Sequence, residues 1–157
     1  MSDPAYFMRE AVRLAQDNRA RGAHPFGAVL TKEGRQVASG VNEVAQTCDP
    51  TSHAEMQALR AAGAQLQQPR LDGCVVYASG YPCPMCLAAM LASGIEKVYY
   101  AFDNEDAVPY GLSSSAAYAA LGLSQEHPPL PLVRIDTGVT AAQVYGAVPG
   151  SQAQGTA

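Results

Sequence analysis

Charge is the scarcest property of this sequence. Only 15% of its residues are charged, whereas soluble domains average about 25%. A surface with so little charge is one that a second copy of the chain can cover in part. The low charge does not indicate disorder, because 48% of the residues are hydrophobic and the net charge is only −4.

Basic residues and long apolar runs are also missing. The chain has 10 Lys and Arg residues against 14 Asp and Glu, which gives no basic surface for a nucleic-acid backbone. No run reaches the roughly 18 apolar residues of a membrane-spanning helix. The first residues lack the basic start and apolar core of a signal peptide. We therefore expect a cytoplasmic protein that binds neither membranes nor nucleic acid.

The length of 157 residues is that of one domain. We expect this domain to span residues 1–148. Residues 149–157 are small and polar, and we expect them to form a disordered tail.

Hydrophobic periodicity and turn residues predict five helices and five strands. The helices are expected at 3–21, 52–62, 84–93, 113–121 and 140–145, and the strands at 26–31, 36–41, 74–78, 95–102 and 130–135. Thr51 or Ser52 is expected to cap the second helix and Gly63 to end it, and 42–50 and 103–111 are expected to be loops. A hairpin followed by strands alternating with helices predicts an α/β fold, a three-layer α/β/α sandwich with a five-stranded mixed sheet.

Two short motifs at predicted helix starts carry nitrogen and sulfur ligands. One contains His53, and the other, Pro-Cys-Pro-Met-Cys, contains Cys83 and Cys86. A catalytic zinc site uses three such protein ligands and leaves a fourth position open. The two cysteines are three residues apart, so both sulfurs can face one point. A helix N-terminus also favours the thiolate over the thiol.

Glu55 lies two residues after His53, an offset that points elsewhere on a helix. We therefore expect Glu55 to lie near the open position and to exchange protons with an activated water rather than to bind the ion. Two alternatives use the same cysteines. A closed zinc knob needs a fourth ligand, for which Cys48, Cys74 and His24 are the remaining donors. A thioredoxin-like dithiol leaves the His-Ala-Glu motif without a role.

The pattern His-x-Glu followed by Pro-Cys-x-x-Cys resembles the signature of the zinc deaminases. The chain is similar to the cytidine and nucleobase deaminase superfamily over nearly its whole length, and most similar to the guanine deaminase and yeast-type cytosine deaminase branch. The stretches that carry this resemblance are 24–29, 40–42, 49–55, 81–89 and 94–101. The resemblance implies one Zn²⁺ per subunit, Glu55 as the catalytic acid and base, and a homodimer in which a C-terminal segment can close over the neighbouring site.

The resemblance also implies a substrate pocket. In it, Asn42 and the Ala54 backbone hydrogen-bond the base, and Phe26 sandwiches the base against the His53 ring. Ser114 and Tyr110 are further candidates for substrate binding.

One stretch departs from the guanine deaminase pattern. Those enzymes carry Phe-Asp-Asp where this chain has Leu112-Ser113-Ser114. The resemblance implies that the second Asp holds the edge of the purine. The hydroxyl of Ser114 cannot replace a carboxylate that accepts two N–H bonds. Either another group supplies the acceptor, or the base is not guanine.

The expected function is hydrolytic deamination of a free nucleobase or related amino-heterocycle, as in purine catabolism, with guanine as the first candidate. A tRNA adenosine deaminase is one alternative, against which the acidic balance counts. Such enzymes also typically carry Glu where this chain has Tyr81. Further alternatives are a deaminase of cytosine, isocytosine or a free nucleoside, and a non-catalytic binding module on the same fold.

Overall fold

A computed structural model describes residues 3–147 of the chain, so the expected tail at 149–157 and the exact end of the domain lie outside the described residues. The elements are α1 (Pro4–Ala20), β1 (Gly27–Lys32), β2 (Arg35–Val41), α2 (Val44–Thr47), α3 (Ala54–Leu66), β3 (Cys74–Gly80), α4 (Pro84–Ser93), β4 (Lys97–Phe102), α5 (Asn104–Ala107), a 3₁₀ turn (Val108–Tyr110), α6 (Ser115–Ala120), β5 (Leu132–Arg134) and α7 (Ala141–Tyr145). None of the helices within this range has the length and apolarity needed to cross a membrane.

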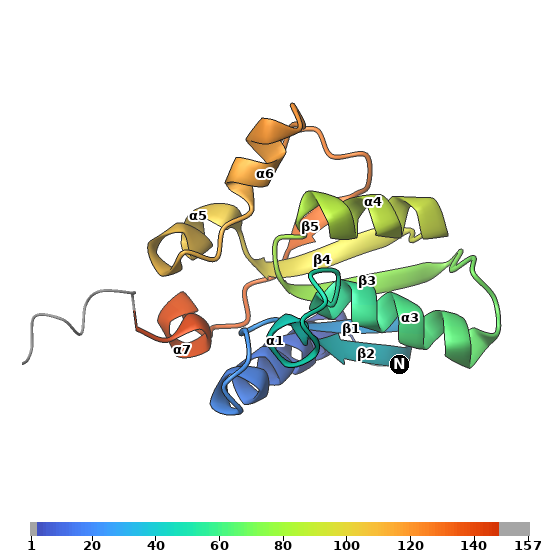
Figure 1. The fold of residues 1–157 in the computed structure, drawn as a ribbon. Helices are drawn as coiled ribbons and strands as arrows, with labels where there is room; N and C mark the ends of the chain where they lie inside the picture. Colours follow the sequence, from blue (N-terminus) through green and yellow to red (C-terminus); the bar gives the residue numbers. More distant parts are fainter. Residues whose placement is uncertain (1–2, 148–157) are drawn as a thin grey trace, which may run out of the picture.

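The five strands form one mixed sheet in the order β2-β1-β3-β4-β5, which confirms the predicted architecture (Figure 1). Strand β1 is antiparallel to both β2 and β3, whereas β3, β4 and β5 are parallel to one another. The N-terminal end of β1 therefore lies at the same edge of the sheet as the C-terminal ends of the other four strands. The functional site lies along this edge.

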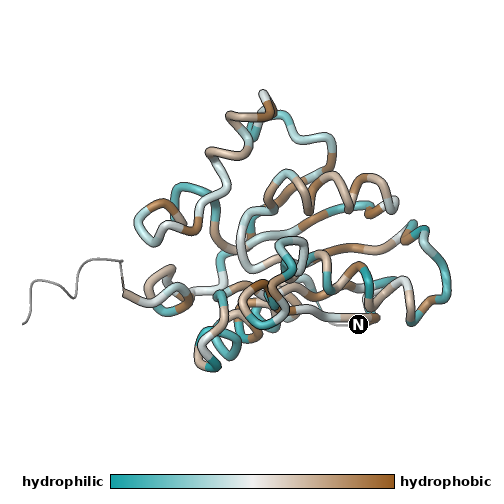
Figure 2. Tube along the Cα trace, viewed as in Figure 1, coloured by the Kyte–Doolittle hydropathy of each residue, from teal (hydrophilic) through white to brown (hydrophobic). Residues whose placement is uncertain are grey.

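Helices cover both faces of the sheet, as the alternation of side chains along the strands requires. Leu30 and Val76 face the core formed with α3 and α4. Their neighbours Val29 and Tyr77 face the second core, formed with α1 and α7. Strand β3 is buried along nearly its whole length, and Figure 2 shows the hydrophobic residues gathered in the interior strands and in α4. The result is the predicted three-layer α/β/α sandwich.

Two glycines allow helices to approach the sheet unusually closely. A Cβ atom on Gly27 would lie 2.7 Å from the Leu14 Cβ on α1. A Cβ atom on Gly40 would overlap the carbonyl oxygen of Ala54 in the first turn of α3. Gly40 thus fixes the N-terminus of α3 against β2, and the start of α3 is where the site begins.

Several predicted boundaries were wrong. Short helices α2 and α5 occupy segments that we expected to be loops, and α5 begins with a capping box between Asp103 and Asp106. Helix α3 starts two residues later than expected, with His53 as its N-cap residue. It also continues through Gly63 to Leu66, and its C-cap residue Gln67 has a left-handed φ of 54°. A glycine inside a helix costs only about 1 kcal/mol, so packing against the sheet overrides it.

Candidate active site

His53, Cys83 and Cys86 converge at the starts of α3 and α4. Their ligand atoms all lie within 4.8 Å of one another. The Nδ1 atom of His53 is 3.4 Å from the Cys83 sulfur and 3.6 Å from the Cys86 sulfur. The structure therefore brings together the three residues that the sequence predicted as metal ligands.

Both helix starts give up an ordinary stabilising contact to make this cluster. His53 is the N-cap residue of α3 and Cys83 that of α4, yet neither side chain bonds to the backbone of its helix. Ser, Thr, Asp and Asn are the residues that normally cap a helix. The His53 and Cys83 side chains instead contact each other between the two helices. The usual preference for a capping side chain is therefore not met at this site, as is expected of functional sites.

All four cysteines are free, and the protonation of the cluster depends on contacts between its members. A hydrogen bond from the Cys86 thiol, with a second from His53, lowers the pKa of Cys83 to about 4. The same bond, together with burial, raises the pKa of Cys86. The hydrogen bond to Cys83 raises the pKa of His53. One thiolate is thus already stable in the cluster, and binding of a metal would displace the remaining protons.

The cluster fits zinc by its donor types and its spacing. Zinc prefers nitrogen and sulfur ligands, and tetrahedral bonds of about 2.0 Å to nitrogen and 2.3 Å to sulfur place these atoms about 3.5 Å apart. The distances from His53 Nδ1 to the two sulfurs match this value closely. Neither Cys48, which is exposed, nor Cys74, which is buried in β3, belongs to the three-residue group. His24 is not in the group either, so among residues 3–147 the group has three members, and three protein ligands are the arrangement of a catalytic zinc rather than a structural one.

Glu55 lies beside the cluster on the first turn of α3. Its Oε2 atom lies 3.4 Å from the Cys86 sulfur. The side chain is only 7% exposed, and burial raises the pKa of its carboxyl group. Glu55 is outside the group of three candidate ligands.

A cavity of 260 Å³ opens onto this cluster. Residues from five separate stretches of the chain line it: His24, Phe26, Asn42, Val44, His53, Glu55, Tyr81, Cys83, Leu112, Ser113 and Ser114. Glu55 is the only carboxylate in this lining. Residues 112–114, which we call the uncharged wall of the cavity, carry no charged side chain.

Asn42 is held in one orientation at the side of the cavity. Its Oδ1 atom accepts a 3.0 Å hydrogen bond from the Val44 N–H. Its backbone is fixed by bonds to Phe26 and to the buried side chain of Asn18. Within residues 3–147, no acceptor bonds to the side-chain nitrogen of Asn42. Asn42 therefore has two N–H groups available to a ligand in the cavity.

Two of the predicted substrate contacts do not line the cavity. Tyr110 packs instead against Tyr145, with a ring separation of 5.4 Å. Ala54 is completely buried under β2. Tyr145 lies behind Phe26, with the ring centres 5.9 Å apart. The structure does place Phe26, Asn42 and Ser114 at the cavity, together with His53.

Sequence reasoning missed several residues of the cavity. His24 was considered only as a possible fourth ligand of a closed zinc knob, and Val44 and Leu112 were given no role in the site. The position of Tyr81 could have indicated that it lines the cavity. It directly follows β3 and lies two residues before the predicted ligand Cys83. Ser113 is adjacent to the predicted Ser114. His24 and Val44 reach the cavity only through the pairing of β1 with β2, which no local pattern shows.

Known proteins with similar sequences and structures agree with the His-Cys-Cys group as a zinc site. The family profile described as "Cytidine and deoxycytidylate deaminase zinc-binding region" matches residues 1–102. Guanine deaminase from Bacillus subtilis is 38% identical over 130 residues, which are 82% of this chain and 83% of that protein. Its X-ray structure has a TM-score of 0.75 and covers 85% of this chain, with 86% of its own length matched.

Another relative is named as an enzyme that acts on tRNA. A tRNA-specific adenosine deaminase from Aquifex aeolicus is 40% identical over 95 residues, which are 60% of this chain and 63% of that protein. This match is shorter than the match to the guanine deaminase, although its identity is similar.

Proposed function

The chain belongs to the cytidine and deoxycytidylate deaminase zinc-binding family and is a hydrolytic deaminase, and on this premise we propose that it deaminates a free nucleobase, with guanine as the first candidate. The observation that carries the proposal is the cavity. It brings the three-ligand cluster, one buried carboxylate and a fixed amide together in a space of 260 Å³. This is somewhat less than the roughly 300–1,000 Å³ typical of ligand pockets. A small planar heterocycle suits it.

His53, Cys83 and Cys86 would hold one zinc ion per chain. When bound there, zinc supplies Lewis-acid activation of the attacking water at neutral pH. Glu55 accepts the proton of that water and delivers it to a ring nitrogen, which makes the adjacent amino-bearing carbon electrophilic. The hydroxyl group adds to this carbon. Glu55 then moves the hydroxyl proton to the amino group, the C–N bond breaks, and ammonia leaves.

The remaining cavity residues orient the base. Phe26 and the His53 ring both line the cavity, and we propose that they hold the two faces of the heterocycle. Asn42 donates from its free amide nitrogen to an acceptor on the ring. Because Val44 fixes the Asn42 carbonyl, this side of the pocket selects ligands with an acceptor at that position.

A tRNA substrate is the second candidate, and its support is the similarity to the Aquifex enzyme. The charge of the chain counts against it. A protein that neutralises several phosphates needs a cluster of basic residues, and this sequence has a net charge of −4. The longer match to the guanine deaminase also favours a free base.

Ammonia release from a panel of substrates tests the proposal. The panel consists of guanine, cytosine, isocytosine, adenine, 8-oxoguanine and triazines, with the matching nucleosides and a tRNA anticodon stem-loop. We expect turnover of at least one free base at more than tenfold higher kcat/KM than any nucleoside or the RNA. Preference for the RNA would contradict the proposal and favour the tRNA enzyme.

We further propose that the protein is a cytoplasmic homodimer. The low charged fraction of 15% supports a partly covered surface. Light scattering coupled to size-exclusion chromatography tests the dimer, and a mass near 16.4 kDa would contradict it.

A further inference from the structure

The uncharged wall of the cavity is held by two residues that do not line it, Asn104 and Gln125. Asn104 is the first residue of α5 and is 6% exposed. Its side-chain oxygen accepts two hydrogen bonds from Ser114, one from the backbone N–H at 2.9 Å and one from the hydroxyl at 3.1 Å. A single buried amide oxygen therefore fixes both the backbone and the side chain of Ser114.

Gln125 connects Asn104 to the rest of the wall. Its side-chain oxygen accepts from the Asn104 amide at 2.7 Å, and its own amide donates to the Ser115 hydroxyl at 3.3 Å. Its backbone oxygen accepts from the Tyr81 hydroxyl at 3.1 Å. Ser113 in turn donates to Ser115 at 3.1 Å. The network thus joins three cavity residues, Tyr81, Ser113 and Ser114, through partners behind them.

The direction of these bonds determines what the wall can offer a ligand. The hydroxyl hydrogens of Tyr81 and Ser114 are donated to oxygens that can only accept, the Gln125 carbonyl and the Asn104 amide oxygen. A hydroxyl whose hydrogen is already used can only accept further hydrogen bonds, through its oxygen lone pairs. The wall is therefore a neutral acceptor and contains no carboxylate.

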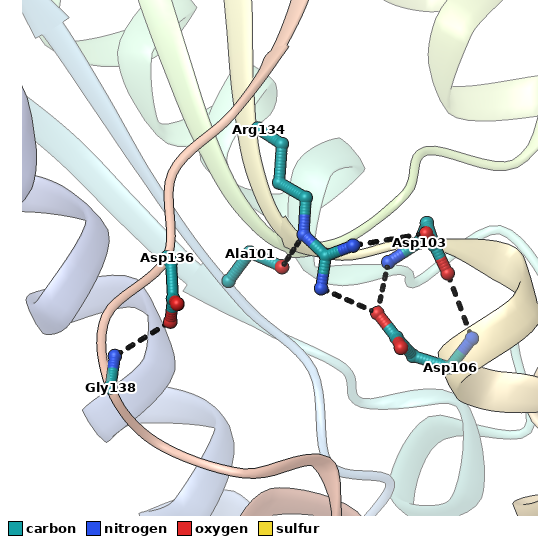
Figure 3. A network of polar contacts seen from close by, with 6 residues as sticks. All are labelled: Ala101, Asp103, Asp106, Arg134, Asp136 and Gly138. Atoms are coloured by element: carbon teal, nitrogen blue, oxygen red, sulfur yellow. Dashed lines mark hydrogen bonds and ion pairs between the residues drawn. The ribbon is translucent and has the colours of Figure 1, made fainter.

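The base of the network is rigid as well. Asp103 caps α5 directly before Asn104, and its capping box with Asp106 is complete. Arg134 on β5 donates to the Asp103 carboxylate at 3.1 Å and to the Asp106 carboxylate at 2.9 Å, and also to the Ala101 carbonyl oxygen (Figure 3). Two ion pairs and a cap thus hold the start of α5, and Asn104 with it.

We propose that Asn104 is a positioning residue for substrate recognition, which holds the Ser114 hydroxyl as an uncharged acceptor for one N–H group of the base. This inference rests on the proposed function, because it assumes a free base in the cavity. It explains how the wall can bind a heterocycle without a carboxylate. It also implies that binding at this position depends on one N–H donor of the substrate, rather than on the two N–H donors that a carboxylate would accept.

A double-mutant cycle tests the proposal, with guanine as the probe, or with cytosine if guanine is not turned over. The variants are Asn104→Ala, Ser114→Ala and the double variant. Loss of one neutral hydrogen bond is expected to raise KM about 2- to 13-fold in each single variant, with kcat within twofold of the wild type. If Asn104 acts through Ser114, the double variant has the KM of Ser114→Ala alone. Independent effects on KM that multiply, or a fall in kcat alone, would overturn the proposal.

Two further variants separate positioning from general stability. Asp3→Ala removes the N-cap of α1, which accepts from the Tyr6 N–H far from the wall, and should lower the melting temperature without changing KM. Gln125 is half-buried, so Gln125→Ala is expected to fold even if Asn104→Ala does not, and to raise KM severalfold. An unchanged KM in Gln125→Ala would count against the network.

Methylated substrates test the acceptor role directly. We expect the wild type to discriminate against at least one of 1-, 7- and 9-methylguanine, or against 1-methylcytosine if cytosine is the probe. Ser114→Ala should reduce that discrimination by at least about twofold. Unchanged discrimination in the variant would overturn the acceptor role. Failure of the wild type to release ammonia from any free base would instead overturn the proposed function, so the two failures are distinguishable.

Discussion

The cavity is lined by two sets of residues that are positioned in different ways. In the first set, His53, Glu55 and Cys83 lie at the starts of two helices, within short motifs of the sequence. In the second set, Ser114 is positioned by Asn104, in a network that also joins Tyr81 to Gln125, 44 residues further along the chain. In the function that we propose, the first set carries the reacting groups, and the second carries the contacts that choose a substrate.

This difference has a physical origin. Helix starts on a packed sheet fix side chains through the backbone, so a short motif is enough to place a ligand. The wall is formed by loops, which can change their residues without disturbing the core. Single substitutions at the helix starts are therefore expected to lower activity strongly, whereas single substitutions in the wall should change substrate preference only by small factors. The predictions below test this contrast.

Loss of a metal ligand should have the largest effect. Cys86 is completely buried and belongs to the three-residue cluster, so Cys86→Ser should abolish zinc binding and activity together. Removal of zinc with a chelator should also lower the melting temperature, because a ligand that binds only the folded state stabilises it. Metal analysis and thermal melting measure both effects. Cys74→Ala, at a buried cysteine outside the cluster, is the control and should keep its zinc; retention of zinc in Cys86→Ser would contradict the assignment.

Glu55→Gln should have the next largest effect. The variant keeps the shape of the side chain but cannot carry the proton, so kcat should fall by about 10²- to 10⁴-fold while the zinc content stays at one per chain. Glu43→Gln is the matched control, because Glu43 lies outside the cavity and bonds to Gln57. Near wild-type turnover in Glu55→Gln would remove the basis for the proposed mechanism.

The same contrast explains how much could be predicted from the sequence. The five-stranded mixed sheet, the three layers and the grouping of His53, Cys83 and Cys86 could be predicted from periodicity and from two motifs at helix starts. The wall could not be predicted, because Asn104 and Gln125 lie in segments whose hydrogen-bond partners are set by tertiary packing. Ser114 was identified only as a departure from a family pattern, and its bond to Asn104 had no signal in the sequence.

The errors in the elements have similar causes. Helix α5 was missed because a four-residue helix has almost no periodicity, although Asp103 and Asp106 have the spacing of a capping box. Gly63 was taken as a stop, but packing of α3 against the sheet carries the helix past it. Tyr110 was expected at the substrate and instead packs against Tyr145, because the 3₁₀ turn at Val108–Tyr110 was not foreseen.

Gly40→Ala should affect the metal end through the backbone. The added Cβ overlaps the Ala54 carbonyl and the Ala58 amide of α3, so the helix must move away from β2. Such overpacking typically costs about 1–3 kcal/mol of stability, and it displaces His53 relative to the cysteines. We expect a lower free energy of unfolding and weaker zinc affinity, measured by denaturant unfolding and competition with a chelator. Gly111→Ala, where a Cβ meets nothing within 4 Å but φ is +70°, is a control for strain without collision and should leave zinc affinity unchanged.

Tyr145→Phe should have the smallest effect, and its sign is the informative part. In the portion of the chain that the structure describes, the Tyr145 hydroxyl is the one buried side-chain polar atom without a hydrogen-bond partner, and burial raises its pKa. Removal of an unpaired buried hydroxyl relieves a desolvation cost of about 1–3 kcal/mol while the ring contacts to Phe26 and Phe102 remain. The variant should therefore be as stable as the wild type or more stable, with unchanged kcat and KM.

Tyr118→Phe is the matched control, because that hydroxyl donates to the Pro82 carbonyl at 2.6 Å, and its loss should destabilise the protein by about 0.5–1.5 kcal/mol. If Tyr145→Phe loses as much stability as Tyr118→Phe, the Tyr145 hydroxyl has a hydrogen-bond partner in solution, and its burial carries no desolvation cost that the variant could relieve.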